Sequence, residues 1–233
     1  MDIFLGVLAN AVAIIIGAFI GVVFKKIKQL KSIGERVFQA FGIFVAIMGA
    51  QGMDLSQPLY YLICIIIGTA IGEAIDIDKQ FNRLGDWMQS KFAKNSEDSN
   101  FSQGFVEASL LFCIGSMTFL GALQSGIEHE HSIYYTKAVL DGITSITMGM
   151  GSGISVAFSA LPIIVYQGIL TLGASVLAPI LTDATVTMCV SVGSLSLVAI
   201  GLNMLKITKI KVANMLPAMF IPMIWQAIQL AIN

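Results

Sequence analysis

The chain is dominated by apolar stretches of about the length that a helix needs to cross a bilayer, which is roughly 20 residues. There are about eight of them, numbered here as spans 1 to 8: residues 3–24, 34–53, 59–75, 105–127, 138–158, 161–181, 186–205 and 213–232. Charged residues make up only 12% of the sequence, about half of the share in soluble domains. The sequence therefore predicts an all-α, polytopic transmembrane helix bundle that forms one domain over residues 1–233.

The basic residues predict the orientation of these spans, because Lys and Arg are retained on the cytoplasmic side of a membrane. Most of the 13 basic residues lie in three loops, after span 1, between spans 3 and 4, and between spans 7 and 8. They are Lys25, Lys26, Lys28, Lys31 and Arg36; Lys79, Arg83, Lys91 and Lys94; and Lys206, Lys209 and Lys211. With eight spans these loops share one side, and only Lys137 falls on the other. We therefore expect both termini outside and the basic loops in the cytoplasm.

The longest polar stretch, between spans 3 and 4, predicts a cytoplasmic amphipathic helix and linker over residues 77–103. Phe81, Leu84, Met88 and Phe92 recur at helical spacing, with Trp87 beside them. Such a stripe is typical of a helix in the membrane interface. A solvated helix packed on the bundle is the alternative. The following "NSEDSN" is expected to be a flexible linker.

Two short sequences recur in the apolar spans. Residues 14–21 read "IIIGAFIG" and residues 65–72 read "IIIGTAIG", and each contains a G-x-x-x-G pattern that lets helix backbones approach closely. The match indicates either a duplication or similar packing demands. A weaker match, "FVAIMG" at 44–49 and "LVAIGL" at 197–202, hints at the inverted repeats common in transporters. The G-x-x-x-G surfaces also offer a means of homo-oligomerisation, with a dimer favoured.

Broken or kinked helices are expected in spans 5 and 8. Span 8 contains Pro217 and Pro222, and each proline removes a backbone donor and frees a carbonyl. In span 5, "ITSITMGMGSGISVAF" at 143–158 combines glycines with hydroxyl side chains. Either these small residues form a tight seam with a neighbouring helix, or the helix breaks there and lines a polar cavity. The turn between spans 5 and 6 is expected at the "SA" before Pro162.

Polar residues inside the membrane are expensive and normally face the bundle interior or water. The candidate residues for binding an ion or solute are Asp141, Thr144, Thr147, Gly149, Gly151, Ser152 and Gln167, with Asn10, Asn203 and Asn214 in support. Asp141 would supply charge or accept a coupling proton, while hydroxyls and freed carbonyls would coordinate the solute. Asparagines of this kind are more often hydrogen-bond partners between helices than ligands, and that interpretation is preferred for these three. Glu107 is explained by its helix N-terminus, where a carboxylate is favoured.

Several classes of function have no residues to support them. The sequence has no H-E-x-x-H, nucleophile elbow, Walker A or Rossmann pattern, so an enzyme is not expected. The "EHEH" at 128–131 and the three cysteines are not expected to bind metal, and no cofactor is implied. The net charge of −1, with its cations confined to loops, gives no reason to expect a nucleic-acid partner.

Four segments resemble a known family. "GVLANAVAIIIGAFIG" near the N-terminus, "ASLLFCIGSMTFLGALQSGI" in span 4, "TKAVLDGITSI" opening span 5 and "IGLNMLKITKIKVANMLPA" across spans 7 and 8 are similar to the domain of unknown function 554 family. The resemblance covers nearly the whole chain and implies a multi-pass protein of the bacterial inner membrane with a suspected transport role. It brings no established substrate or binding residues.

Two hypotheses of function follow. In the first, the chain is a membrane transporter or channel for an ion or small polar solute, with a polar cavity lined by span 5 and with proton or sodium coupling as one form. In the second, it is a non-transporting scaffold or sensor whose basic loops and interfacial helix contact lipid or a cytoplasmic partner.

Overall fold

The computed structural model describes residues 2–27, 31–92 and 101–232, and in that part of the chain the regular structure is helical, without strands. The α-helices are α1 (Leu5–Lys26), α2 (Lys31–Gln51), α3 (Pro58–Ile75), α4 (Ile77–Phe92), α5 (Phe101–Cys113), α6 (Ser116–Leu123), α7 (Ser132–Ser152), α8 (Ser155–Phe158), α9 (Ala160–Leu172), α10 (Ala174–Leu177), α11 (Asp183–Met204) and α12 (Ile221–Ile232). Short helices of other pitch are η1 (Asp2–Phe4), the π-helix η2 (Gln124–Glu128) and the 3₁₀ helix η3 (Val212–Phe220). The predicted linker at 95–100, Lys28 and Lys94 lie outside the described residues.

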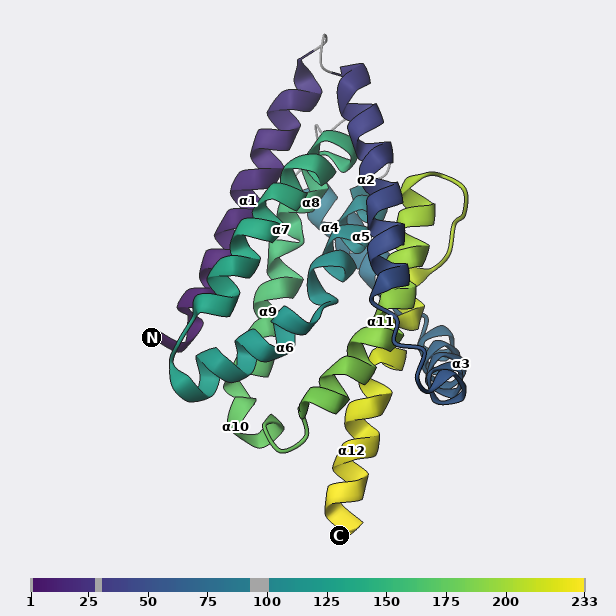
Figure 1. Cartoon of the computed structure of the whole chain (residues 1–233). Coiled ribbons are helices and arrows are strands. Elements are labelled where there is room, and N and C mark those ends of the chain that lie inside the picture. The colour runs from purple at the N-terminus through teal and green to yellow at the C-terminus, as the bar shows by residue number, and fades with distance from the viewer. Residues whose placement is uncertain (1, 28–30, 93–100, 233) are drawn as a thin grey trace.

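The helical membrane bundle is confirmed. Six helices in the described ranges are long and apolar enough to cross a membrane, and the α5–α6 pair makes a seventh if it is one bent span. Helix α7 is not among them, because Lys137, Asp141 and its hydroxyl residues lower its hydropathy. It nevertheless lies along α1 for most of its length (Figure 1). The count of about eight spans therefore stays a prediction.

Helices α1 and α7 run parallel and form a seam of backbone contacts. A Cβ on Gly17 would collide with the carbonyl of Gly142, and one on Gly21 would collide with the carbonyl of Ile146. Gly149 faces the same seam, where a Cβ would come within 2.7 Å of the Ala18 carbonyl oxygen. Glycine is required at these positions because the two backbones leave no room for a side chain. For Gly149 the structure therefore matches the seam interpretation.

The second glycine octet has an equivalent use elsewhere in the molecule. Gly68 and Gly72 of α3 contact the backbone of Ala218 and Asn214 in η3. Both G-x-x-x-G patterns are thus occupied by helices of the same chain. The interpretation of these glycines as a dimer face is therefore wrong, and dimerisation stays a prediction without a surface assigned to it.

Helices α2 and α11 form a third close pair, which is antiparallel. A Cβ on Gly49 would come within 2.7 Å of the Ser194 carbonyl oxygen. A Cβ on Gly201 would likewise lie 2.6 Å from the Gly42 carbonyl oxygen. The "FVAIMG" and "LVAIGL" sequences belong to these two helices and lie in direct contact. Their likeness is explained by shared packing, because small residues recur wherever two helices touch in a bilayer.

The helix breaks fall partly where the sequence predicted them. Helix α7 ends at Ser152, and Gly153 turns the chain with φ 74°. The turn therefore lies at Gly153 rather than at the predicted "SA", because glycine adopts a positive φ without strain. Pro162 is instead accommodated in the first turn of α9. Span 8 begins as the 3₁₀ helix η3 with Pro217 inside it, as the proline signal indicated.

A larger break was not predicted. Between α5 and α6 the chain bends by 58°, and Gly115 there has φ 144° and ψ 149°. This backbone region is accessible almost only to glycine. The single glycine in "CIGSM" carried no proline or paired glycine to signal the bend.

Helix α4 is packed on the bundle through one face. Met88 is buried, Gly85 lies against Ser102, and the ring of Phe81 lies 6.2 Å from that of Phe105. Leu84 and Trp87 remain exposed on the other face. Some apolar residues of the stripe therefore pack on the bundle, and the others form an outward-facing apolar surface.

The apolar residues on the outside of α1 and α3 form the surface expected to meet lipid. On α1 they include Val12, Ile16, Phe19 and Val23, each 51–59% exposed. Because such residues would be unfavourable in water, their exposure on long apolar helices agrees with a surrounding bilayer.

Candidate functional site

A buried polar cluster joins α1, α7 and α9. The Asn10 side-chain amide of α1 donates to Asp141 Oδ2 of α7 at 3.0 Å and to Gln167 Oε1 of α9 at 3.4 Å. Lys137 Nζ, one turn before Asp141 on α7, makes an ion pair with the same Oδ2 at 2.8 Å. The structure therefore brings together three of the candidate residues, which are separated by up to 157 positions in the sequence.

All four side chains of this cluster are enclosed. Asn10 and Gln167 are 0% exposed, Lys137 is 6% and Asp141 is 8% exposed. Two polar atoms have no hydrogen-bond partner among the described residues: Asn10 Oδ1, an acceptor, and Gln167 Nε2, a donor. Buried polar atoms are nearly always paired with protein or water. The cluster therefore has unused hydrogen-bonding capacity, one acceptor on Asn10 and one donor on Gln167.

Lys137 was missed as a site residue. The sequence placed it in an exposed loop, because span 5 was expected to begin at residue 138. The structure instead starts α7 at Ser132, which puts Lys137 and Asp141 on the same face of one helix. The signal that could have found the pair is its i, i+4 spacing, which aligns opposite charges on a helix.

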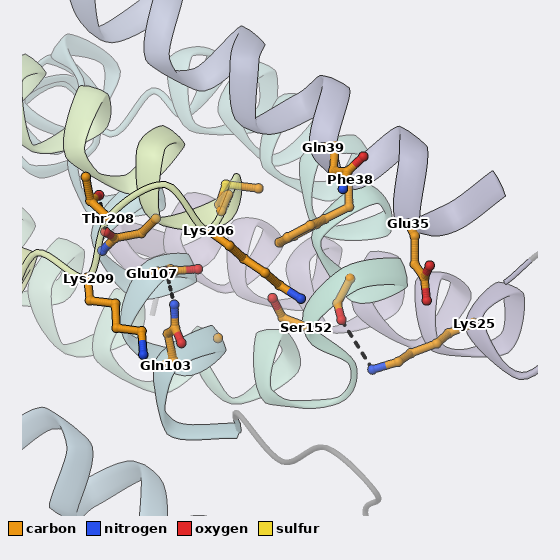
Figure 2. A pocket seen from close by; sticks show the side chains of 14 residues that line it. Lys25, Glu35, Phe38, Gln39, Gln103, Glu107, Ser152, Lys206, Thr208 and Lys209 are labelled. Carbon is orange, nitrogen blue, oxygen red and sulfur yellow. Dashed lines mark hydrogen bonds between the residues drawn. The ribbon is translucent and has the colours of Figure 1, made fainter. Parts of the chain in front are cut away.

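A separate cavity of about 560 Å³ opens where α1 and α7 end and α2 begins. We call this the basic end of the molecule. The cavity is lined by Lys25, Glu35, Phe38, Gln39, Gln103, Gly104, Glu107, Gly151, Ser152, Asn203, Met204, Lys206, Thr208 and Lys209. In Figure 2, Lys209, Gln103 and Glu107 lie on one side of the view, Lys25 and Glu35 lie on the other, and Lys206 reaches to the middle near Ser152. Lysines from the first and last predicted basic loops thus surround one cavity, as the same-side prediction requires.

The cavity contains the end of the glycine-rich segment. Lys25 Nζ donates to the carbonyl oxygen of Gly151 at 3.2 Å (Figure 2). A cation is favoured at a helix C-terminus, where the last carbonyls lack intrahelical partners. Gly151 is also required sterically, since a Cβ there would collide with the ring of Phe38. Gly151 and Ser152 therefore line a cavity, while Gly149 belongs to the α1 seam, and the segment combines both of its expected uses.

Asn203 organises the loop that carries two of the cavity lysines. Its Oδ1 accepts from Thr208 Oγ1 at 2.8 Å and from the Ile210 amide at 3.0 Å, and its Nδ2 donates to the Ile210 carbonyl at 2.9 Å. These three bonds fold residues 204–210 back onto the end of α11. Asn203 thus acts by holding the loop, as well as lining the cavity.

Asn214 connects elements at the basic end. Its Oδ1 accepts from the Asp78 amide at 2.7 Å, and its Nδ2 donates to a carboxylate oxygen of Glu73. It thereby joins η3 to α3 and α4, which is the interhelical role considered for the asparagines. Lys211 pairs with Glu73 at 3.4 Å, and this contact raises the pKa of Lys211, with Asp76 contributing. Desolvation raises the pKa of Asp78, which faces an adjoining cavity of about 220 Å³.

Thr144 and Thr147 are not brought into either arrangement. Both are half-buried on α7, and neither lines the two cavities described at the basic end. Ser145 is the hydroxyl that faces inward, where it donates to the Gly142 carbonyl at 2.8 Å. Thr144 and Thr147, at i+3 and i+6 from Asp141, are therefore rotated away from the interior. Because a helix advances 100° per residue, Ser145, at i+4 from Asp141, stays on its face better than Thr144 or Thr147.

Comparison with known proteins places the chain in a family. A family model with the description "Protein of unknown function (DUF554)" matches residues 5–227. The chain belongs to the DUF554 family. This DUF554 protein is 32% identical to the uncharacterized membrane protein YdfK of Bacillus subtilis (strain 168), over 93% of each chain. It is 26% identical to the uncharacterized protein YqgA of Escherichia coli (strain K12), over 94% of each chain. No solved structure matches.

Proposed function

We propose that this DUF554 protein is a non-enzymatic transporter or channel that moves an ion or small polar solute across the bacterial inner membrane. The observation that carries the proposal is the enclosed cluster of Asn10, Lys137, Asp141 and Gln167. An ionisable residue within a membrane bundle is by default a candidate for a substrate or ion pathway. Basic loops in the cytoplasm and both termini outside form part of the proposal.

The energetics of the cluster support a functional role. A buried ion pair contributes little to stability compared with apolar residues of similar volume, because both charges lose their hydration. Lys137 and Asp141 bear that cost, and Asn10 Oδ1 and Gln167 Nε2 add two atoms without recorded partners in the described chain. A cluster with unused hydrogen-bonding capacity is better suited to receiving a polar group than to holding helices together.

The position of the cavity supports an alternating mechanism. Asp141 and Gly151 are ten residues apart on α7, or ~15 Å at 1.5 Å per residue. Between them α1 and α7 are in backbone contact at Gly17 and Gly21. We propose that this arrangement is the state open at the basic end, in which the α1–α7 seam separates the cavity from the cluster, and that relative movement of these helices joins the two.

Flux measurement in proteoliposomes tests the proposal. The purified chain is assayed with proton, sodium, potassium and amino-acid gradients, and Asp141→Asn is compared with Asp183→Asn, which changes an exposed carboxylate at the start of α11. We expect Asp141→Asn to lower flux by roughly tenfold or more, since a charged hydrogen-bonding partner is lost, and Asp183→Asn to leave it unchanged. Thr147→Val should also leave it unchanged, because that hydroxyl lies away from the cluster.

The absence of flux from the folded wild type for every gradient would refute the transport proposal. The alternative function, a membrane scaffold or sensor, would then be preferred. Its support is the exposed pair Leu84 and Trp87 on α4, where Lys91 Nζ lies 5.3 Å from the Trp87 ring centroid.

A further inference from the structure

The floor of the cavity at the basic end carries a buried carboxylate. Glu107 of α5 is 5% exposed, and one of its oxygens accepts from the Gln103 amide at 2.8 Å (Figure 2). In the described part of the chain no ion pair to Glu107 is recorded. A carboxylate taken out of water without a cation is strongly unfavourable. The floor therefore favours a positively charged group that enters from the cavity.

The lining of the same cavity also carries lysines, together with the exposed carboxylate of Glu35. Lys206 and Lys209 are exposed on the loop that Asn203 holds in place. Lys206 also begins that loop with φ 60°, so the backbone direction is set by the turn and by the Asn203 bonds together. Lys25, by contrast, donates to the end of α7. The two loop lysines are thus the cations placed to meet a negatively charged group at the entrance.

Charge complementarity selects among the possible ligands. A simple anion would pair with Lys206 and Lys209 but would leave the buried Glu107 carboxyl without a cation. A simple cation would pair with Glu107 but would leave the two lysines without an anion. A molecule with both charges satisfies floor and mouth at once. The adjoining 220 Å³ cavity shares Gln103, Glu107, Asn203 and Lys209 with the larger one, so Glu107 and Lys209 face the same enlarged space.

We infer that this cavity binds a small zwitterion of amino-acid type, with its ammonium group on Glu107 and its carboxylate between Lys206 and Lys209. Gln103, Ser152 and Thr208 supply neutral polar groups along the wall. The inference rests on the proposed function only in treating the cavity as the solute's entry site, since binding itself requires no transport.

Calorimetric titration of the full chain in nanodiscs tests the inference with matched probes. γ-Aminobutyrate, butyrate and butylamine each have four carbons in a line and differ in which charged end groups they carry. ε-Aminocaproate, caproate and hexylamine repeat the comparison with six carbons. We expect the zwitterion in at least one set to bind roughly tenfold or more tightly than both of its singly charged partners, because each charged contact removed costs at least one factor of ten.

Variants assign the two charges to their residues. Glu107→Gln should weaken the zwitterion by about tenfold and strengthen the carboxylate probe, whereas Lys206→Met with Lys209→Met should weaken both. Lys79→Met, on the exposed surface of α4 and outside the cavity lining, is the matched control and should change neither. Thermal unfolding of each variant establishes that it is folded.

Three results would overturn the inference: equal binding of carboxylate and zwitterion, unchanged zwitterion affinity in Glu107→Gln, or no binding of any probe by the folded wild type. These outcomes are separable from the proposed function. Zwitterion binding without flux would refute the transport proposal but leave the ligand assignment standing. Flux of another solute without zwitterion binding would refute the ligand assignment but leave the transport proposal standing.

Discussion

Removal of Lys137 is the sharpest test of the buried cluster. In Lys137→Met the linear side chain is retained but its charge is lost. Asp141, whose side chain taken alone is 11% exposed, then keeps only the Asn10 amide as a hydrogen-bond partner in the described chain. Breaking one side of a buried ion pair costs about 3–5 kcal/mol. At roughly 2–4 °C per kcal/mol for a domain of this size, the melting temperature should fall by roughly 6–20 °C.

A matched substitution and a double variant complete the design. Lys211→Met removes the same charge from an ion pair whose side chains are 51% and 58% exposed, and it should change the melting temperature little, because water screens such pairs. Lys137→Met combined with Asp141→Asn should recover most of the loss, since no unpaired charge remains. Thermal unfolding in nanodiscs measures the wild type, the two lysine variants, Asp141→Asn alone and the double variant.

The reasoning is refuted if Lys137→Met is no less stable than Lys211→Met. It is also refuted if the double variant loses the sum of the two single effects. Either result would mean that Lys137 and Asp141 do not interact in a water-poor interior, and the main support for the proposed polar pathway would be lost.

Two further changes test the helix seam and a surface turn. Gly21→Ala places a Cβ against the Ile146 carbonyl and should destabilise the fold by about 1–3 kcal/mol in thermal unfolding. Gly34→Ala is the control, because the atom nearest to its new Cβ would lie at 3.5 Å, and it should be neutral or slightly stabilising. Equal effects of the two substitutions would contradict the close α1–α7 seam. Hydrogen bonds from the Ser56 hydroxyl and amide lower the pKa of Asp54 below 3.8. Their stabilising effect is therefore present above pH 3.8 and is lost as acid protonates Asp54. Ser56→Ala should therefore raise the pKa of Asp54 in an NMR titration and lower the melting temperature at neutral pH but not in strong acid, and a pKa that does not move would exclude the hydroxyl as its main cause.

Most residues of the buried cluster could be predicted from the sequence, but the contacts between them could not. Asn10, Asp141 and Gln167 were identified because polar residues inside apolar segments stand out against their neighbours. Their mutual contact depends on the packing of α1, α7 and α9, which local pattern cannot supply. Lys137 was missed because the expected boundary of span 5 was a few residues too late, and helix boundaries are the least certain part of any periodicity argument.

The sequence by itself determined the kind of protein. Long apolar stretches must become helices in a bilayer, because backbone groups have no other hydrogen-bond partners there, and loop lysines indicate which helix ends belong together. Tertiary structure decided how the small residues are used. Gly149 and Gly151 look alike in "TMGMGSG", yet one contacts the α1 backbone and the other lines a cavity beside Lys25. A glycine carries no side chain to indicate its surroundings, so only the position of the neighbouring helices distinguishes a seam from a cavity wall.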